Sequence, residues 1–196
     1  MIDYCQLIAA AREKRGTFFE LDNVEFAYVG PDSNGVITVG INGTTEWADL
    51  RWSLRTEKVW WPFADRGFMT QGSVQLGTLA SCCEVLESIL KNHKVRFVGH
   101  SVGGNAAQAL ALAWQDLGKG EVEGVVTFGA PAVFSKGFKW PNIAMTRYVC
   151  GNDPIPVLWA PFWKHTHSAT KIPSVNKCMS FILDHKLSSY ERSLLK

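Results

Sequence analysis

Several features that are common in other protein classes are missing from this chain of 196 residues. No apolar run approaches the roughly 20 residues that a membrane-spanning helix needs, which excludes an integral membrane protein. No block of like charge is present, since 20 Lys and Arg against 18 Asp and Glu leave a formal net charge of +2. Without a basic stripe, nucleic acid is not expected as a partner. Internal repeats, low-complexity tracts and linkers are also absent, which indicates a single domain over residues 1–196.

The cysteines exclude two further kinds of site. They number five and lie at Cys5, Cys82, Cys83, Cys150 and Cys178. An odd number without any C-x-x-C pair argues against a disulfide framework and against a zinc site. The vicinal pair 82–83 suggests a reactive thiol, but Cys83 falls on an apolar stripe that recurs every three or four residues between Leu76 and Leu90. We therefore expect Cys83 to be a small buried residue of a helix.

The first residues lack the pattern of a secretion signal. Asp3 lies where a signal peptide carries positive charge, and the apolar stretch that follows it is short. Residues 1–16 instead predict an amphipathic helix. We expect a protein that is cytoplasmic, or released without a recognisable signal peptide, and that has no transmembrane segment.

The composition is that of a globular protein, with 46% apolar and 19% charged residues. β-Branched and aromatic runs predict strands, and periodic apolar residues predict helices between them. The expected strands are 24–30, 35–41, 94–99, 123–129 and 144–150, and the expected helices are about 73–91, 102–118 and 186–194. The turn sequence PDSNG should join the first two strands as a hairpin. This alternation predicts an α/β fold with a central, mostly parallel sheet flanked by helices.

The pentapeptide 99–103, Gly-His-Ser-Val-Gly, matches the G-x-S-x-G pattern of a nucleophile on a sharp strand-to-helix turn. Such a turn raises the hydroxyl of Ser101 above the sheet edge, and its two glycines avoid side-chain clashes. A buried-type strand precedes the pattern and a helix follows it, which favours a nucleophile over an incidental glycine turn. Ser101 would also lie at a helix N-terminus, where backbone N–H groups face a developing oxyanion.

A serine hydroxyl needs a base to take its proton, and the base needs an acid to orient it. In folds that carry this turn, the acid and then the histidine follow the serine along the chain. The acidic residues downstream of Ser101 are Asp116, Glu121, Glu123, Asp153, Asp184 and Glu191. Among these, Asp153 comes just after a predicted strand, and open α/β sheets place functional groups at the carboxyl ends of strands. Asp153 is therefore the expected acid, and a surface turn is the alternative.

Three histidines follow Asp153, and the residue pattern leaves two of them as competitors for the base. His165 and His167 form an H-x-H pair, which would bind a metal if both side chains pointed one way, but no third ligand is evident nearby. We therefore expect neither a metal nor a cofactor. His185 lies just before the last predicted helix. From the residues alone, both His167 and His185 remain open as the base.

Five motifs in order resemble those of the class 3 lipases, the family of the fungal triacylglycerol lipases. They are I-N-G-T-T-E-W-A-D-L (41–50), R-G-F (66–68), G-H-S-V-G-G-N-A (99–106), V-T-F-G-A-P-A-V (126–133) and G-N-D-P-I-P (151–156). Together they cover most of residues 24–190, and T-F-G-A-P is the most diagnostic of them. The resemblance implies an α/β-hydrolase fold with a Ser-His-Asp triad.

The resemblance also assigns roles that the residue pattern leaves open. The family's D-H-x-x-Y-F pattern maps onto Asp184 and His185 with Tyr190 nearby, whereas W-K-H-T-H resembles a segment whose histidine is not catalytic. It therefore implies that His185 is the base. Thr44 and Val102 correspond to the residues that form the family's oxyanion hole, Thr44 through its N–H and hydroxyl and Val102 through its N–H. As an alternative, the Gly-Thr-Thr segment at 43–45 is a turn that ends a strand.

The family places its lid between the oxyanion loop and the long helix, which maps onto residues from about 51 to 66. Trp60, Trp61 and Phe63 in this segment are expected to cover an acyl pocket or to meet a lipid surface, where such side chains prefer the interface. The alternative is that these aromatic side chains fill ordinary core. Transient contact with a membrane or lipid surface through the lid is accordingly expected.

These inferences together predict a serine carboxylic-ester hydrolase that cleaves lipid-like esters through an acyl-enzyme. Its partner would be a lipid or another ester substrate. An acyltransferase or a thioesterase of the same fold is an alternative within enzymes. A catalytically inactive hydrolase fold that serves as a binding module is an alternative from a different class. The presence of Ser101, Asp153, His185 and Thr44 argues against the inactive form.

Overall fold

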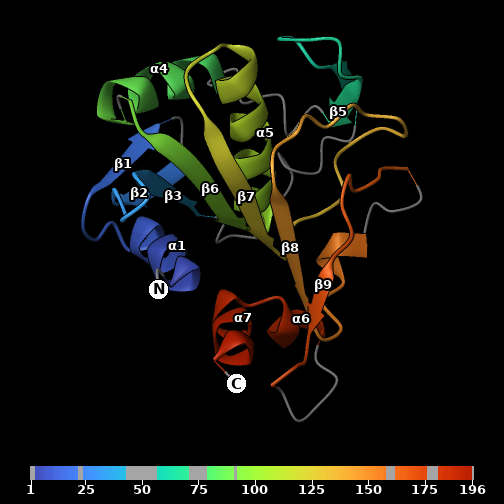
Figure 1. The fold of residues 1–196 in the computed structure, drawn as a ribbon. Helices are drawn as coiled ribbons and strands as arrows, with labels where there is room; N and C mark the ends of the chain where they lie inside the picture. The colour runs from blue at the N-terminus through green and yellow to red at the C-terminus, as the bar shows by residue number, and fades with distance from the viewer. Residues whose placement is uncertain are drawn as a thin grey trace.

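The computed structural model describes residues 3–21, 24–42, 57–70, 79–90, 92–157, 162–175 and 181–195. Its main feature is a seven-stranded sheet in the order β1-β2-β3-β6-β7-β8-β9 (Figure 1). These strands are β1 (Phe18–Leu21), β2 (Val24–Val29), β3 (Val36–Ile41), β6 (Lys94–His100), β7 (Val122–Phe128), β8 (Met145–Cys150) and β9 (Thr170–Ile172). The first three pair antiparallel, and every pair from β3 to β9 is parallel. The predicted hairpin and the mostly parallel sheet are confirmed.

Helices cover both faces of the sheet (Figure 1). On one face lie α4 (Leu79–Leu90) and α5 (Val102–Asp116), and on the other lie α1 (Tyr4–Arg12) and α7 (Leu187–Leu194). A separate two-stranded hairpin is formed by β4 (Lys58–Trp60) and β5 (Phe68–Thr70). Two short elements, the 3-10 helix η1 (Ile155–Val157) and α6 (Phe181–Asp184), lie in the C-terminal third. This is the α/β architecture that the sequence predicts.

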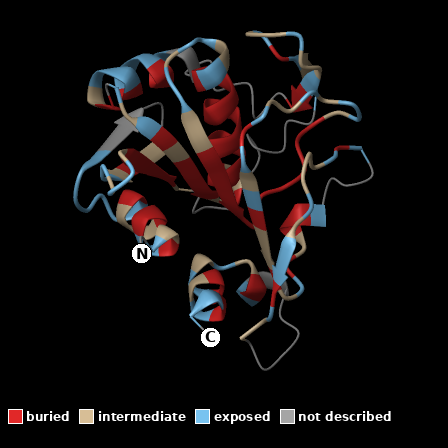
Figure 2. Ribbon diagram, in the orientation of Figure 1, coloured by how far each residue is buried: buried red, intermediate tan, exposed pale blue. Residues whose placement is uncertain are grey.

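Burial is deepest in the central strands and in α5 (Figure 2). All six residues of β3 are buried, as expected for a strand with a helix layer on each side. The α5 helix approaches the sheet closely because its first turn carries small residues. A Cβ at Gly104 would lie 2.7 Å from the Cβ of Ala130, so only glycine allows this approach.

The other predicted helices are also present within the described residues. Leu79–Leu90 is the described part of the helix expected at 73–91, and Cys83 is fully buried in it. Burial raises the pKa of the Cys83 thiol to about 12, which keeps it protonated and unreactive. The first helix is capped by Asp3, whose carboxylate accepts hydrogen bonds from two backbone N–H groups of the first turn. None of the described helices combines the length and the apolar character that crossing a membrane requires.

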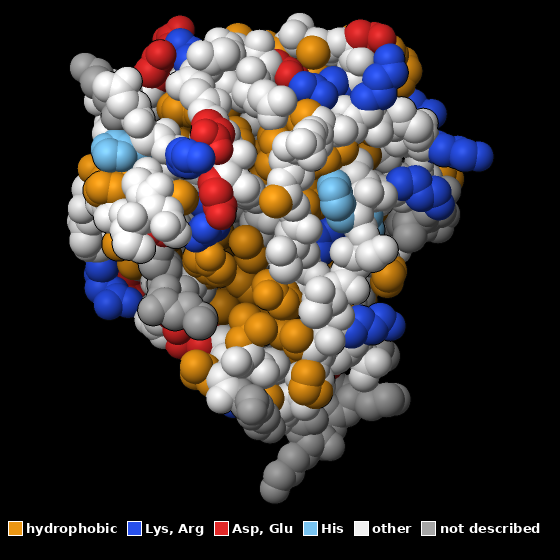
Figure 3. Space-filling view, viewed as in Figure 1, with side chains coloured by type: hydrophobic (Ala, Val, Ile, Leu, Met, Phe, Trp, Pro, Cys, Tyr) orange, Lys and Arg blue, Asp and Glu red, His pale blue; other side chains and the backbone are white. Residues whose placement is uncertain are grey.

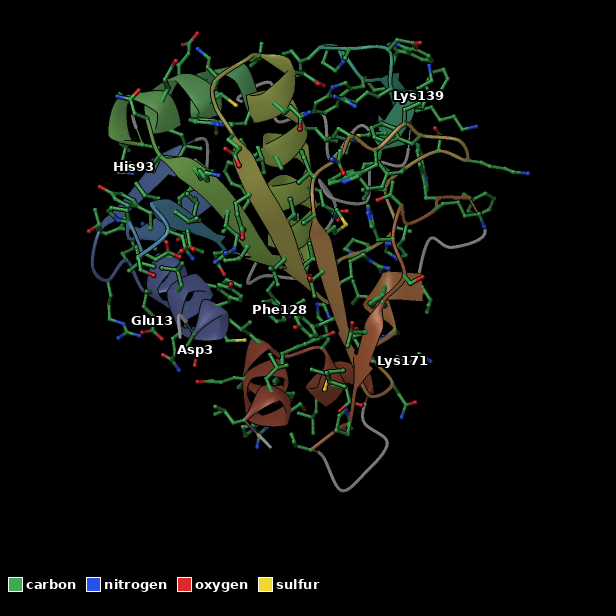
Figure 4. The ribbon with its side chains drawn as sticks, viewed as in Figure 1. Asp3, Glu13, His93, Phe128, Lys139 and Lys171 are labelled. Atoms are coloured by element: carbon green, nitrogen blue, oxygen red, sulfur yellow. The ribbon has the colours of Figure 1, made fainter. Side chains whose placement is uncertain are left out.

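The sheet face that carries α1 and α7 also presents apolar side chains between these helices. Val98, Val126 and Phe128 on β6 and β7 belong to one buried cluster with α1 and α7, and Tyr148 on β8 packs against it. The space-filling view shows apolar atoms at the centre of this face (Figure 3), where Phe128 lies between the two helices (Figure 4). Phe128 ends β7 and therefore marks the carboxyl ends of the parallel strands, where the candidate functional residues lie.

Candidate active site

The turn between β6 and α5 holds Ser101 in a strained conformation. Its φ is 55° and its ψ is −124°, a combination that costs a non-glycine residue about 1–3 kcal/mol. The two glycines of the pattern are required by contact. A Cβ at Gly99 would lie 2.1 Å from the carbonyl oxygen of Gly103, and a Cβ at Gly103 would lie 2.5 Å from that of Asn42. The predicted steric reason for the G-x-S-x-G spacing is thus visible in the structure.

Three side chains from separate elements meet at this turn and form a chain of hydrogen bonds. His185 Nε2 lies 2.9 Å from Ser101 Oγ, and His185 Nδ1 lies 2.8 Å from Asp153 Oδ2. A carboxylate accepts only, so Nδ1 carries the proton and Nε2 is left to accept from the serine hydroxyl. The Asp153 side chain is fully buried, whereas that of His185 is 20% exposed. The structure therefore brings together the serine, the acid and one of the two histidines that were left open.

The carboxylate of Asp153 is held by two further donors. The Tyr190 hydroxyl donates to Oδ2, and the Ile155 N–H donates to Oδ1 at 2.9 Å. Burial and the neighbouring charge of Asp153 raise the pKa of Tyr190 far above its usual range, so the phenol stays protonated and donates. Gly129 passes close by with φ +60°, and a Cβ there would lie 2.5 Å from Asp153 Oδ2. The acid thus has a fixed orientation in a closely packed pocket.

His100, the residue before Ser101, contacts the backbone of His185. Its Nε2 donates to the backbone oxygen of His185 at 2.6 Å, and its ring centroid lies 4.8 Å from that of His185 and 5.9 Å from that of Tyr190. Burial, followed by the charge of His185, lowers the pKa of His100 to about 3. His100 therefore stays neutral and holds the backbone of His185 in place.

We expect the protein to lose stability in mild acid, because burial lowers the pKa of the imidazoles of His100 and His165 in the folded state. Burial lowers the pKa of His100 to about 3 and that of His165 to about 4, whereas both take up a proton near pH 6.5 in the unfolded chain. The unfolded state then binds more protons, so stability is lost as the pH falls from about 6.5 through this window. At pH 5 each of these two imidazoles should lower the free energy of unfolding by up to about 2 kcal/mol.

Urea unfolding at pH 7.5 and at pH 5 measures this loss. His165→Gln, whose amide does not take up a proton, should make the difference smaller, because one of the imidazoles with a lowered pKa is removed. Equal free energies of unfolding at the two pH values would contradict this account of both histidines.

His165 and His167, the H-x-H pair, have different contacts outside this hydrogen-bonded group, and their rings do not share a partner. His165 Nε2 lies 2.8 Å from the backbone oxygen of Pro156, and the His167 ring packs edge-on against Trp140 at 5.7 Å. The nearby guanidinium of Arg147 also lowers the pKa of both imidazoles, after burial, and its positive charge opposes a metal cation. Among the described residues, no group of three or more His, Cys, Asp or Glu side chains is arranged to hold a metal ion.

Of the two residues predicted to bind the oxyanion, the structure describes Val102 but not Thr44. Val102 is the first residue of α5, directly after the serine. The N–H groups in the first turn of a helix have no acceptor within the helix, which is compatible with the role predicted for the N–H of Val102. Thr44 lies outside the described residues.

The predicted lid residues divide between the surface and the core. Residues 51–56 lie outside the described part of the chain, and 57–66 contribute to the β4–β5 hairpin. Trp61 is fully buried, and its Nε1 donates to Asp116 of α5 at 2.7 Å, which fits the alternative that it fills ordinary core. Phe63 is half-buried and packs edge-on against Trp61 at 5.2 Å. Trp60 is 48% exposed and remains the lid candidate.

Two residues that support the triad were not predicted from the sequence. His100 lies inside the nucleophile motif, but its neighbours in the chain do not reveal that it binds the backbone of a residue 85 positions away. For Tyr190, the family pattern indicates only a position near the histidine. An available signal was a tyrosine on the buried face of the last helix, since a buried phenol usually finds a hydrogen-bond partner.

Comparison with known proteins agrees with this geometry. A family model described as Lipase (class 3) matches residues 38–163. No sequence among the curated proteins gives a significant match.

Several solved structures share the fold. A Rhizomucor miehei lipase in complex with its propeptide has a TM-score of 0.63 at 18% identity, over 88% of this chain and 66% of that one. A nonglycosylated Yarrowia lipolytica lipase has a TM-score of 0.61 at 17% identity, over 79% of this chain and 64% of that one. A lipase of Rhizopus microsporus var. chinensis has a TM-score of 0.60 at 17% identity, over 81% of this chain and 59% of that one. The chain thus spans about three fifths to two thirds of these lipases.

Proposed function

The chain belongs to the class 3 lipase family, and from this premise we propose that it is a serine carboxylic-ester hydrolase acting on lipid-like esters. The observation that carries the proposal is the hydrogen-bonded series from Ser101 through His185 to Asp153. A strained serine at a strand-to-helix turn, with an imidazole nitrogen 2.9 Å from its hydroxyl, suits the attack on an ester carbonyl.

In the proposed reaction, His185 Nε2 takes the proton of Ser101 as Oγ attacks the carbonyl carbon of the ester. The resulting imidazolium is stabilised by Asp153, which accepts from Nδ1–H throughout. The imidazolium then gives its proton to the departing alcohol, and an acyl-enzyme remains on Ser101. Water, deprotonated by the same imidazole, attacks the acyl-enzyme. The imidazolium returns that proton to Ser101 Oγ as the bond to the acyl group breaks and the acid leaves.

We propose that the oxyanion is bound by Val102 and Thr44. For Val102 the support is its N–H at the first position of α5, directly after the nucleophile. For Thr44 the support is sequence similarity alone, since it lies within the family match over 38–163. Two such donors point at the place where negative charge develops, so they stabilise the transition state more than the ground state.

We also propose that the β4–β5 hairpin makes transient contact with lipid. Its exposed side carries Trp60 and Phe68, which are 48% and 38% exposed and pack edge-on at 4.8 Å between ring centroids. Aromatic side chains of this kind prefer the boundary between water and lipid. Trp61 and its bond to Asp116 would anchor the hairpin to α5 beneath them.

A fluorophosphonate probe tests the proposal in one step, because it forms a covalent bond with an activated serine. We expect labelling of the native protein and none after heat denaturation. A panel of p-nitrophenyl esters of graded chain length, a triacylglycerol emulsion and phospholipid vesicles, all assayed with EDTA present, then defines the substrate class. Release of free acid in the presence of an added alcohol separates hydrolysis from acyl transfer.

The opposite results are equally informative. Absence of both labelling and turnover would favour an inactive hydrolase fold that serves as a binding module. Turnover that EDTA abolishes would contradict the metal-free reaction and return attention to His165 and His167.

A further inference from the structure

A second buried carboxylate lies next to the base without being part of the triad. Asp184 directly precedes His185 along the chain, ends α6, and is fully buried. Its side chain reaches the loop that carries Asp153, where it accepts from the N–H of Asn152. A buried carboxylate is costly unless it is well bonded, so its contacts indicate what it stabilises.

The carboxylate of Asp184 joins three segments of the chain. Oδ2 accepts from the backbone N–H of Asn152 at 2.9 Å, and Oδ1 accepts from the hydroxyl of Ser174 at 2.6 Å. Asn152 is the residue before Asp153, and Ser174 follows β9 by two positions. One side chain thus connects the loop that carries Asp153 (the acid loop) and the segment after β9 to the segment that carries His185.

The backbone of the acid loop is shaped to admit this carboxylate. Gly151 has a φ of +49°, and a Cβ there would lie 2.4 Å from Asp184 Oδ2 and 2.6 Å from the Cβ of Ser174. The Gly151 N–H in turn donates to the backbone oxygen of Ile172 in β9 at 2.9 Å. The glycine of the G-N-D-P-I-P motif therefore allows close contact between the acid loop and the carboxylate beside the base.

This contact bears directly on the geometry of the triad. Asp153 and His185 are separated by 32 residues and lie on different loops, so their 2.8 Å contact depends on how these loops are fixed to each other. A hydrogen bond to an ionised carboxylate is about twice as strong as a neutral one. A displacement of about 1 Å between catalytic groups costs on the order of 100-fold in rate.

We propose that Asp184 is a positioning residue of the hydrolase, which sets the distance between acid and base by holding the N–H of Asn152. The inference rests on the proposed function. Asp184 itself does not touch the reacting atoms, and its effect passes through Asp153 and His185.

The test compares Asp184→Ala with Asp184→Asn. The alanine variant removes both acceptors, and its kcat for a short p-nitrophenyl ester should fall about 10- to 100-fold with KM within about 3-fold. The asparagine variant keeps an oxygen for the N–H of Asn152 and can donate its amide to Ser174, so its kcat should stay within about 5-fold of the wild type. This rescue follows from the geometry of the contact.

A second readout does not depend on turnover. The proton that His185 Nδ1 shares with Asp153 gives a low-field NMR resonance, which we assign by its loss in His185→Ala. It should broaden or move to high field in Asp184→Ala and persist in Asp184→Asn. Leu86→Ala is the matched control, because Leu86 is fully buried in α4 and belongs to the core on the other face of the sheet. It should lower Tm and leave both kcat and the resonance unchanged.

A merely structural role would give a different result, namely a lower Tm in Asp184→Ala with the kcat and resonance of the wild type, and this would overturn the proposal. If the alanine variant does not fold, Asp184→Ser replaces it, since its short hydroxyl does not reach the N–H of Asn152. A wild-type protein with no turnover and no fluorophosphonate labelling would instead refute the proposed function. The resonance would still report the contact between Asp153 and His185 in that case.

Discussion

Ser101→Ala is expected to lower the kcat of ester hydrolysis by roughly four to six orders of magnitude, since removing a triad nucleophile has effects of this size. The alanine keeps the Cβ and the backbone of the turn but has no oxygen to attack the carbonyl or to accept the acyl group. KM should change little, because the oxyanion donors and the substrate contacts remain. Fluorophosphonate labelling should be lost completely.

The fold of Ser101→Ala should stay intact. Ser101 is buried, and the hydrogen bond to His185 is the contact of its hydroxyl that the change removes. Circular dichroism and Tm check this directly. Ser88→Ala is a matched control prepared in parallel, because its hydroxyl bonds the backbone of Val85 on the exposed side of α4. Near-normal turnover and labelling in Ser101→Ala would refute the whole assignment of the site.

The parts of the fold that follow from local pattern could be predicted from the sequence. The G-x-S-x-G turn, the strand before it and the helix after it are all encoded within about twenty consecutive residues, and the structure has β6 and α5 there. The hairpin of β2 and β3 follows from the PDSNG turn. In each case the residues that form the element lie close together in the chain.

The elements that could not be predicted depend on distant partners. Strands β4, β5 and β9 have three residues each, which is too short for an alternation of apolar and polar residues to be evident. The β9 strand exists because Thr170–Ile172 pairs with the end of β8. Such pairing is a property of the assembled sheet.

The lid segment illustrates the same limit for side chains. Trp60 and Trp61 are adjacent and chemically identical, and the sequence gives no reason to separate them. In the structure Trp61 is fully buried and reaches the carboxylate of Asp116, whose side chain is 4% exposed, whereas Trp60 is 48% exposed. The decisive factor is which side of the hairpin faces α5.

The choice between the two histidines also required the folded chain. Residue pattern left His167 and His185 open, and similarity to the lipases favoured His185. The structure brings His185 to Ser101, while His167 bonds to Thr166 and lies against Trp140. The catalytic role of either residue remains a prediction that substitution tests.

His185→Ala should therefore abolish turnover almost completely, whereas His167→Ala should leave a competent enzyme. Without His185, no group takes the proton of Ser101, and the expected loss in kcat is of the same order as that for the serine itself, about 10⁴- to 10⁶-fold. His167→Ala removes the ring contact with Trp140, but Arg147 binds the backbone oxygen of His167, which the alanine keeps. Its kcat should stay within about 3-fold of the wild type, because the triad is untouched.

The pH profiles of the two variants strengthen the comparison. General-base catalysis needs an Nε2 that can accept the proton of Ser101, so kcat/KM of the wild type should be lower in acid. His167→Ala should keep this acid limb, and the residual activity of His185→Ala should lack it. If His167→Ala is inactive and His185→Ala retains turnover, the base comes from the W-K-H-T-H loop and the hydrogen bonds around Ser101 serve the fold alone.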